Sequence, residues 1–288
     1  MYISKYLKTL SSRSGVRMKL DVLMSCMHQT DASLVHKSRL YGDVIVINQC
    51  DHTDYNEQIT EHGHIRMYST TDRGLTRSRN MAISKSQADI CLLCDDDETF
   101  SNNYETKIIS AYEALPHADV IIFDIENRPK TLGNKVRRLR FPHTMKVSSW
   151  QISFRRKPLV HAGVSFDELL GAGTGNGAEE ELKFLLDCQK AGLCIYYVPT
   201  PIAAVAQTSS TWFSGFNETF FENRGATTRY ILGSFLAFLY AVYYIVSKRS
   251  LYREHISAKQ AFLSTLRGIQ QNKIGKLAKQ VAKKERVV

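Results

Sequence analysis

The chain has 288 residues, of which 43% are apolar and 23% charged, a balance that excludes wholesale disorder. Six prolines and sixteen glycines exclude collagen-like and proline-rich chains. The net charge is +10, and residues 247–288 carry eleven Lys or Arg against two Asp or Glu. A near-neutral body with a strongly basic tail favours an anionic partner: a membrane surface, a nucleic acid or an acidic protein.

Residues 1–18 include basic side chains but no apolar run long enough for the core of a signal peptide, so we expect a lead-in segment there. The six cysteines are scattered through predicted strands and helices, which indicates reduced, buried thiols in a cytosolic protein. Cys91 and Cys94 would point to opposite faces of a strand, so we expect no zinc or redox pair. The histidines show no metal-ligand spacing.

Short apolar runs alternate with helical patterns in the first half of the chain. The apolar runs predict strands at 21–26, 43–48, 64–68, 89–94 and 120–124. Helical periodicity predicts helices at 31–38, 75–86 and 104–115. Strands that are apolar throughout and separated by helices are typical of a parallel sheet covered on both faces. We therefore expect an α/β fold with a mainly parallel, Rossmann-like sheet, whose ligands bind at the carboxyl ends of the strands.

The second half begins differently. Residues 127–160 are rich in Arg and Lys and predict irregular structure or antiparallel strands, one of them at 151–155. A glycine-rich loop at 171–177, a helix at about 178–191 and a strand at 194–198 follow. Because the glycine-rich loop does not follow the first strand, we expect no dinucleotide site there.

Residues 230–246 contain no formal charge and are followed directly by Lys248 and Arg249. As a helix this segment would span roughly 25 Å, slightly less than the ~30 Å hydrocarbon core of a bilayer. It is either a buried helix of the globular body or a membrane-embedded or interfacial helix. The basic tail, with helical spacing over residues 258–284, favours the membrane.

Four acids, Asp95 to Glu98, directly follow the predicted strand 89–94. Adjacent carboxylates at the end of a buried strand repel one another unless a cation offsets their charge, and hard divalent ions prefer carboxylate oxygens. A helix N-cap would need only one acid. The cluster therefore predicts a divalent metal site, where the ion can stabilise the charge on a leaving phosphate.

A second acidic group opens the helix after the glycine-rich loop. The helix dipole alone explains Glu179, Glu180 and Glu181 in the first turn. A carboxylate beside a ligand cleft can also act as a general base that takes a proton from an attacking hydroxyl. The residues themselves leave both explanations open.

Four segments in order resemble the GT-A fold glycosyltransferases of family 2, of the kind that builds bacterial surface polysaccharides. They are DVIVINQCD (43–51), GLTRSRNMA (74–82), the D-x-D segment DICLLCDDDE (89–98), and the stretch 166–198 with its F-D-E, glycines, acids and Y-V-P. The resemblance covers about residues 21–207. It implies a GT-A catalytic domain at 19–215, between a lead-in at 1–18 and a helical C-terminal extension at 216–288 that associates with a membrane.

The resemblance also implies roles for single residues. Asp97 would bind the metal, Mn²⁺ or Mg²⁺, and Asp95 the metal or the ribose, with Asp96 sharing in this. Glu181, or its neighbour Glu180, would be the general base that deprotonates the acceptor hydroxyl, and the anomeric centre would invert in one displacement.

Arg79 would lie near the nucleotide, and so would Asn48 and Gln49, which stand where the family has the acid that reads the base. Since an amide both donates and accepts hydrogen bonds, the preferred base is open. Glu179 stands where the family has a glycine before its acid pair. Trp212 or Phe213 would stack on a sugar ring or lipid headgroup, with ordinary packing as the simpler explanation.

The implied activity is metal-dependent transfer of a sugar from a nucleotide-sugar donor to a hydroxyl of a lipid-linked or polysaccharide acceptor. It would serve capsule, exopolysaccharide or lipopolysaccharide synthesis. Such an enzyme would work at the cytoplasmic face of the bacterial inner membrane, held there peripherally or by an anchor through residues 230–288.

Two other functions compete with this one. A nucleotidyltransferase needs a glycine-rich, basic loop after the first strand, and residues 27–33 contain no glycine, Lys or Arg. A degenerate GT-A domain without catalysis would dock on a membrane or a nucleic acid. Nucleic acid is not expected as a partner, because the basic tail has few aromatic residues for stacking.

Overall fold

The computed structural model describes residues 18–176, 179–206 and 215–285. The chain forms two compact units, each described by itself below. Unit 1 consists of Met1–Arg73, Arg77–Phe166 and Phe184–Gln207. Unit 2 consists of Gly74–Thr76, Asp167–Lys183 and Thr208–Val288.

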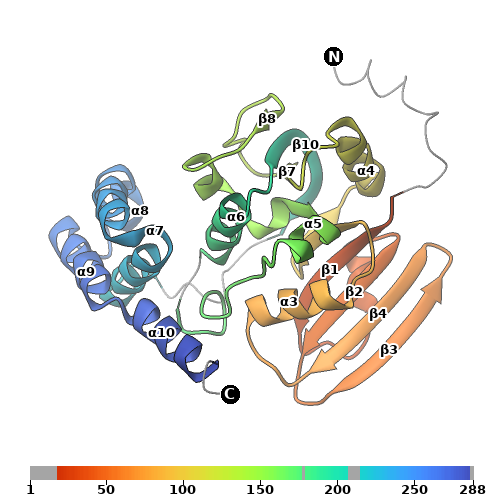
Figure 1. Ribbon diagram of the computed structural model, residues 1–288, viewed down its shortest axis with the longest axis horizontal. Helices are drawn as coiled ribbons and strands as arrows, with labels where there is room; N and C mark the ends of the chain where they lie inside the picture. The colour runs from red at the N-terminus through yellow and green to blue at the C-terminus, as the bar shows by residue number, and fades with distance from the viewer. Residues whose placement is uncertain (1–17, 177–178, 207–214, 286–288) are drawn as a thin grey trace. The chain divides into compact units, whose positions relative to one another are not determined.

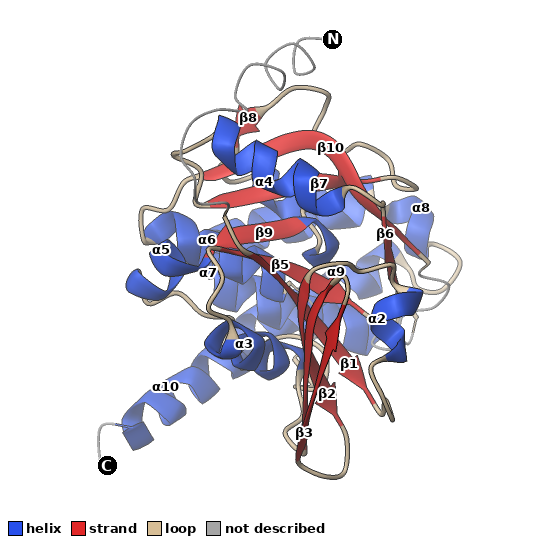
Figure 2. Ribbon diagram, turned by 90° about the vertical axis from the view of Figure 1, so that its right-hand side faces the viewer, coloured by secondary structure: helices blue, strands red, loops and turns tan. Residues whose placement is uncertain are grey.

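Unit 1 is built on one mixed sheet of ten strands in the order β3-β4-β2-β1-β5-β9-β7-β10-β6, with β8 paired to β10 (Figure 2). The strands β4, β2, β1 and β5 are parallel neighbours, and β10 runs parallel to β7. The strand bounds are β1 Leu20–Met27, β2 Asp43–Gln49, β3 Asp54–Thr60, β4 Gly63–Thr70, β5 Ile90–Asp95, β6 Glu98–Phe100, β7 Val120–Ile125, β8 Arg137–Arg138, β9 Ile152–Arg155 and β10 Ile195–Val205.

Helices cover both faces of this sheet, and strand alternation explains why. In β1, Val22 and Met24 belong to one core cluster, while Leu23 points to the other. The first cluster packs under α2 (Ser33–Lys37) and α4 (Tyr104–Ala114). The second packs under the unit 1 parts of α3 (Leu75–Lys85) and α6 (Glu180–Lys190) and under α5 (Arg156–His161). The expected two-sided α/β sheet is confirmed.

The strands predicted from apolar runs are all present, but several further elements are not signalled by such runs. Strand β3 is exposed along almost its whole length and pairs antiparallel with β4 at the edge of the sheet. The short strands β6 and β8, helix α5 and two 3-10 turns, His143–Lys146 and Ser149–Gln151, were likewise not predicted as elements. Strand β9 confirms the antiparallel strand expected at 151–155, and β10 runs further than the predicted 194–198.

The helices of unit 2 are α7 (Glu218–Ser247), α8 (Arg249–Tyr252), α9 (Ala258–Gln271) and α10 (Lys273–Glu285), seen at the blue end of the chain in Figure 1. Helix α7 contains the predicted segment 230–246 but is interrupted at Gly233, whose φ of 81° and ψ of 176° are not helical. By length and composition α7 could cross a membrane. The predicted tail helix is two helices, because Asn272 adopts a left-handed conformation between α9 and α10.

The two longest helices of unit 2 approach each other closely. A Cβ atom on Gly225 of α7 would lie 2.1 Å from the carbonyl oxygen of Thr265, and one on Gly268 of α9 would lie 1.9 Å from that of Glu222. No side chain fits at either position. Glycine at both positions therefore sets how closely α7 and α9 pack.

Candidate active site

The acidic turn after β5 points its carboxylates in different directions. Glu98 is buried, and its Oε1 accepts a hydrogen bond of 2.8 Å from the backbone N–H of Asp95. Burial, and next the charge of Asp95, raises the pKa of Glu98 well above its usual range. Glu98 therefore stabilises the turn from its buried side. Asp96 and Asp97 form the outer part of the turn.

Asp95 is held by two side chains from distant parts of unit 1. Nη2 of Arg79 donates to both carboxylate oxygens, at 3.0 and 3.3 Å, and Ser149 Oγ donates at 2.8 Å. Arg79 is only 1% exposed, and its guanidinium lies 5.4 Å from the ring centroid of Phe166. Because it is so deeply buried, Arg79 is not placed to touch a ligand, and its role in the fold is to hold Asp95.

Asp96 and Asp97 are partly buried and lie beside the negative charge of Asp95. Partial burial, and next the charge of Asp95, raises the pKa of both groups, and Asp96 adds to the effect on Asp97. No ion pair to either residue occurs in the part of the chain that the structure describes. Two outward carboxylates of this kind fit a hard divalent cation such as Mg²⁺ or Mn²⁺.

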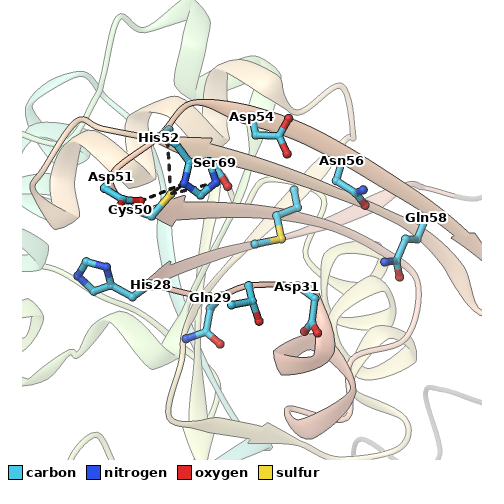
Figure 3. Close-up of a pocket in the computed structure, with 12 residues that line it drawn as sticks. His28, Gln29, Asp31, Cys50, Asp51, His52, Asp54, Asn56, Gln58 and Ser69 are labelled. Atoms are coloured by element: carbon cyan, nitrogen blue, oxygen red, sulfur yellow. Dashed lines mark hydrogen bonds and ion pairs between the residues drawn. The ribbon is translucent and has the colours of Figure 1, made fainter.

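A cavity of about 460 Å³ lies at the carboxyl ends of β1 and β2 and extends along β3 (Figure 3). Side chains from the loop after β1 face those after β2 across it. Its lining residues are His28, Gln29, Thr30, Asp31, Cys50, Asp51, His52, Asp54, Asn56, Gln58, Met67 and Ser69. An open α/β sheet binds its ligands at this edge.

Asn48 lies beneath this cavity and does not line it. Its amide is fully buried, accepts a hydrogen bond from the N–H of Gln29 at 2.9 Å, and donates to the carbonyl of Gln29 at 2.8 Å and to Ser69 at 3.2 Å. Gln49 is buried as well and is not among the lining residues. Asn48 thus fixes the loop after β1, and through that loop it positions Gln29 in the cavity wall.

The cavity contains a group of possible metal ligands that sequence spacing did not reveal. Ligand atoms of Cys50, Asp51 and His52 all lie within 4.8 Å of one another, the one such group of three among the described residues. His52 Nδ1 is 3.0 Å from Asp51 Oδ1 and 3.7 Å from Cys50 Sγ. This mixed set suits a softer transition metal, unlike the carboxylates after β5, which do not gather as closely.

The second acidic group belongs to unit 2, at the start of α6. Glu180 is buried and Glu181 is half-buried, so Glu181 is the more accessible of the two. Glu179 has a φ of 85°, in the left-handed region where a glycine carries no steric penalty. Its carboxylate pairs with Arg224 of α7 at 2.9 Å. A left-handed turn explains why the resembling family has glycine here.

The predicted site residues thus fall into two sets. In unit 1 the structure brings Arg79 to Asp95, at the base of the turn that carries Asp96 and Asp97. Glu180 and Glu181 belong to unit 2. Trp212 and Phe213 lie outside the residues that the structure describes.

Comparison with known protein families gives one match. Residues 26–167 match the family described as Glycosyl transferase family 2. This stretch, just under half of the chain, is a glycosyl transferase family 2 domain. No curated protein sequence matches it.

Solved structures show the same fold for this family 2 glycosyltransferase. The crystal structure of S. aureus TarS 1-349 matches with a TM-score of 0.52 at 14% identity, covering 73% of this chain and 65% of that one. Its complex with UDP-GlcNAc matches with a TM-score of 0.58 at 15% identity, covering 86% and 80%. The complex with UDP gives 0.53 at 14%, covering 88% and 81%. The GT-A fold is thereby confirmed, and the family match of residues 26–167 supports the assignment as a glycosyltransferase.

The match does not extend over the whole of every TarS structure. The chain spans 65% of TarS 1-349 in one structure, slightly less than two thirds, and 39% of TarS in another. At such low identity the likeness carries the fold and no more.

Proposed function

We propose that this glycosyltransferase moves a sugar from a nucleotide-sugar donor to a hydroxyl of a lipid-linked or polysaccharide acceptor, with inversion at the anomeric carbon. The observation that carries the proposal is the turn after β5. It presents Asp96 and Asp97 outward, with raised pKa values and with no ion pair in the described part of the chain. TarS structures hold UDP-GlcNAc and UDP, which makes uridine nucleotides the first donors to test.

Asp97, with Asp96 and Asp95, would hold a divalent cation, Mn²⁺ or Mg²⁺. When bound, such an ion offsets the negative charge that develops on the leaving diphosphate. The protein's own contribution is rigidity: Arg79 and Ser149 fix Asp95, and buried Glu98 closes the turn beneath it. A fixed set of oxygens avoids reorganisation during the reaction.

We assign the cavity beside β1 and β2 to the nucleoside part of the donor. Its size suits a base and a ribose, and its place at the carboxyl edge of the sheet supports the assignment. Asn48 would act by holding the loop after β1 in place, and Gln29, Asp51 and His52 would offer polar contacts. These contacts include both hydrogen-bond donors and acceptors.

Glu181 would be the general base. It would take the proton of the acceptor hydroxyl as that oxygen bonds to the anomeric carbon, while the bond from that carbon to the diphosphate oxygen breaks on the opposite face. Glu181 is half-buried and so the more accessible of the two acids, whereas Glu180 is buried and is the less accessible alternative.

We further propose that the enzyme works at the cytoplasmic face of the bacterial inner membrane, peripherally, through residues 230–288. After Gly233, one side of α7 is apolar and exposed, and its exposed residues are Phe235, Leu236, Phe238, Leu239, Val242, Tyr243 and Val246. The other side packs on α9 through Ala237 and Ala241. Since α7 is interrupted at Gly233 and partly covered, an interfacial position fits it better than a crossing of the bilayer.

Donor binding tests the core of the proposal. We would titrate nucleoside diphosphates and nucleotide sugars into the protein by calorimetry, with and without Mn²⁺, using the wild type and Asp97→Ala. One nucleotide should bind only with Mn²⁺, and Asp97→Ala should lose that binding. Equal binding by both proteins, or binding indifferent to Mn²⁺, would contradict the assigned metal site.

A further inference from the structure

One face of α7 makes polar contacts with the segment that leads into α6, the helix whose first turn carries Glu180 and Glu181. Arg224, Thr227 and Tyr230 are three residues apart and therefore lie on one side of the helix. All three reach the segment Asp167–Lys183, which belongs to the same compact unit. Arg224 Nη1 donates to Glu179 Oε1 at 2.9 Å, Thr227 Oγ1 to the carbonyl of Asn176 at 3.1 Å, and the Tyr230 hydroxyl to Asp167 Oδ2 at 2.6 Å.

The bond from Arg224 is a buried ion pair. The two side chains are only 16% and 18% exposed, so water screens their attraction weakly. Arg224 Nη1 also donates to the Tyr240 hydroxyl at 2.6 Å, and its guanidinium lies 4.4 Å from the ring centroid of Tyr244. A charge that far from water needs its partner, because removal of one member leaves the other desolvated and unpaired.

The partner of Arg224 holds an unfavourable backbone conformation. Glu179 has a φ of 85°, which a residue with a Cβ adopts only when its surroundings impose it. Its carbonyl accepts the hydrogen bond from the N–H of Lys183 in the first turn of α6. A change in the Glu179 backbone would therefore re-aim the first turn, which carries Glu180 and Glu181.

We propose that Arg224, supported by Thr227 and Tyr230, is a positioning residue that holds Glu179 in its left-handed conformation and thereby aims the carboxylate of Glu181. The inference rests on the proposed function in one respect, that Glu181 is the general base. It gives α7 a second role: the helix that carries the exposed apolar surface after Gly233 also fixes the geometry of the proposed general base.

Substitutions at Glu179 separate backbone strain from loss of the ion pair. Glu179→Ala removes the carboxylate and keeps the steric penalty of a Cβ at this φ. Glu179→Gly removes the same carboxylate, yet tolerates the turn without strain. We expect kcat to decrease more in Glu179→Ala than in Glu179→Gly, with donor Kd unchanged in both. Equal kcat values for the two variants would overturn the proposal.

Substitutions at Arg224 test the ion pair between Arg224 and Glu179 directly. A misplacement of a catalytic group by about 1 Å can reduce the rate about a hundredfold, and we expect a decrease of this order in kcat for Arg224→Met, with partial recovery in Arg224→Lys. The matched control is Arg267→Met, which removes the exposed pair between Arg267 of α9 and Glu218 of α7, 2.7 Å apart. Thermal unfolding first establishes that each variant is folded. The kcat of each folded variant is then measured on the nucleotide-sugar panel with Mn²⁺ and compared. A folded Arg224→Met that matches Arg267→Met in kcat would overturn the proposal.

A double variant separates this inference from the proposed function. If Arg224 acts through Glu181, then Arg224→Met should reduce kcat little further once Glu181→Gln is present. Independent, multiplying losses would contradict positioning while leaving Glu181 as the base. Wild-type kcat in Glu181→Gln alone would show that the base is wrong, and the positioning role would fail with it.

Discussion

At the scale of single residues, the acidic turn after β5 shows what neighbouring residues can and cannot predict. The cluster from Asp95 to Glu98 is visible in the sequence because its members are adjacent. Their different tasks are not visible, since Arg79 and Ser149, the partners of Asp95, lie 16 and 54 residues away. Only the fold brings these side chains together, so the sequence predicts the place of the charge and not its partners.

At the cavity too, the sequence locates the region but not the side chains that line it, as Asn48 shows. The sequence predicts a ligand site at the end of β2, where the structure has a cavity, but it does not reveal which side chains turn into the fold. Asn48 is fully buried, while Gln29 and His52, which follow neighbouring strands, line the cavity. Cys50, Asp51 and His52 carry no recognised ligand spacing, because three consecutive residues gather only when the chain turns.

We predict that Glu98→Gln stabilises the protein at neutral pH. The pKa of Glu98 is raised by burial, so the folded state binds its proton more tightly than the unfolded state does. Its contribution to stability is complete below the ordinary pKa of a glutamate and is lost as the pH rises through the raised value. Glutamine keeps the acceptor for the Asp95 N–H and never ionises.

The measurement is thermal unfolding at pH 4 and pH 7. The Tm of Glu98→Gln should exceed that of the wild type by a few degrees at pH 7, and the two should converge at pH 4. A lower Tm for the variant at pH 7 would show that the carboxylate is ionised and partnered in the fold.

At the scale of elements, apolar runs predicted the central strands well because both faces of those strands are buried. Strand β3 was not predicted because its sequence, DYNEQIT, is polar and contains no apolar run. Its residues are exposed at the edge of the sheet. The interruption of α7 was not predicted because a single glycine in an apolar run costs a helix only about 1 kcal/mol, which does not by itself indicate a break at Gly233. The break at Asn272 depends on one left-handed residue, which periodicity does not detect.

We predict that Gly268→Ala separates α7 from α9. The new methyl group would lie within 2 Å of the Glu222 carbonyl oxygen, so the helices must move apart at a cost of about 1–3 kcal/mol. Gly275→Ala in α10 is the control, since the nearest atoms to its Cβ all belong to the Asn272 side chain, whose end at 2.5 Å can rotate away while no backbone has to move. There we expect a gain of up to about 1 kcal/mol, because alanine favours a helix over glycine.

Chemical denaturation of both variants measures this contrast. Destabilisation by Gly268→Ala alone is the expected result. Equal stability of the two variants would show that the packing of α7 on α9 tolerates the extra methyl group.

At the scale of the whole molecule, charge and exposed apolar surface occur in the same unit. The lysines Lys273, Lys276, Lys279, Lys283 and Lys284 of α10 accompany the exposed apolar residues of α7 after Gly233. That part of α7, residues 234–247, would span about 21 Å as a helix, too little to cross a bilayer core. Insertion of the exposed apolar residues of α7 into one leaflet, with the lysines of α10 over anionic headgroups, would account for both the apolar surface and the charge.

We predict selective binding to anionic vesicles. The protein should sediment with vesicles of phosphatidylglycerol and phosphatidylethanolamine and bind phosphatidylcholine vesicles weakly. The double variant Phe235→Ser/Phe238→Ser should bind about tenfold more weakly or worse, since each phenyl group contributes apolar burial.

The control is Ile59→Ser, which removes an apolar side chain that is 86% exposed on β3 and should leave vesicle binding as it is. Weakening by Ile59→Ser as large as that by the double variant would contradict a specific docking face on α7.

The proposed function predicts that Asp97 of the acidic turn and Glu181 are each required for sugar transfer from a nucleotide donor. The most direct test measures nucleoside diphosphate release from a panel of nucleotide sugars with Mn²⁺, by the wild type, Asp97→Ala and Glu181→Gln. The account predicts release from one donor by the wild type, cessation on chelation, and loss of release in both variants while Glu181→Gln still binds the donor. Release that survives chelation and both substitutions would contradict the account.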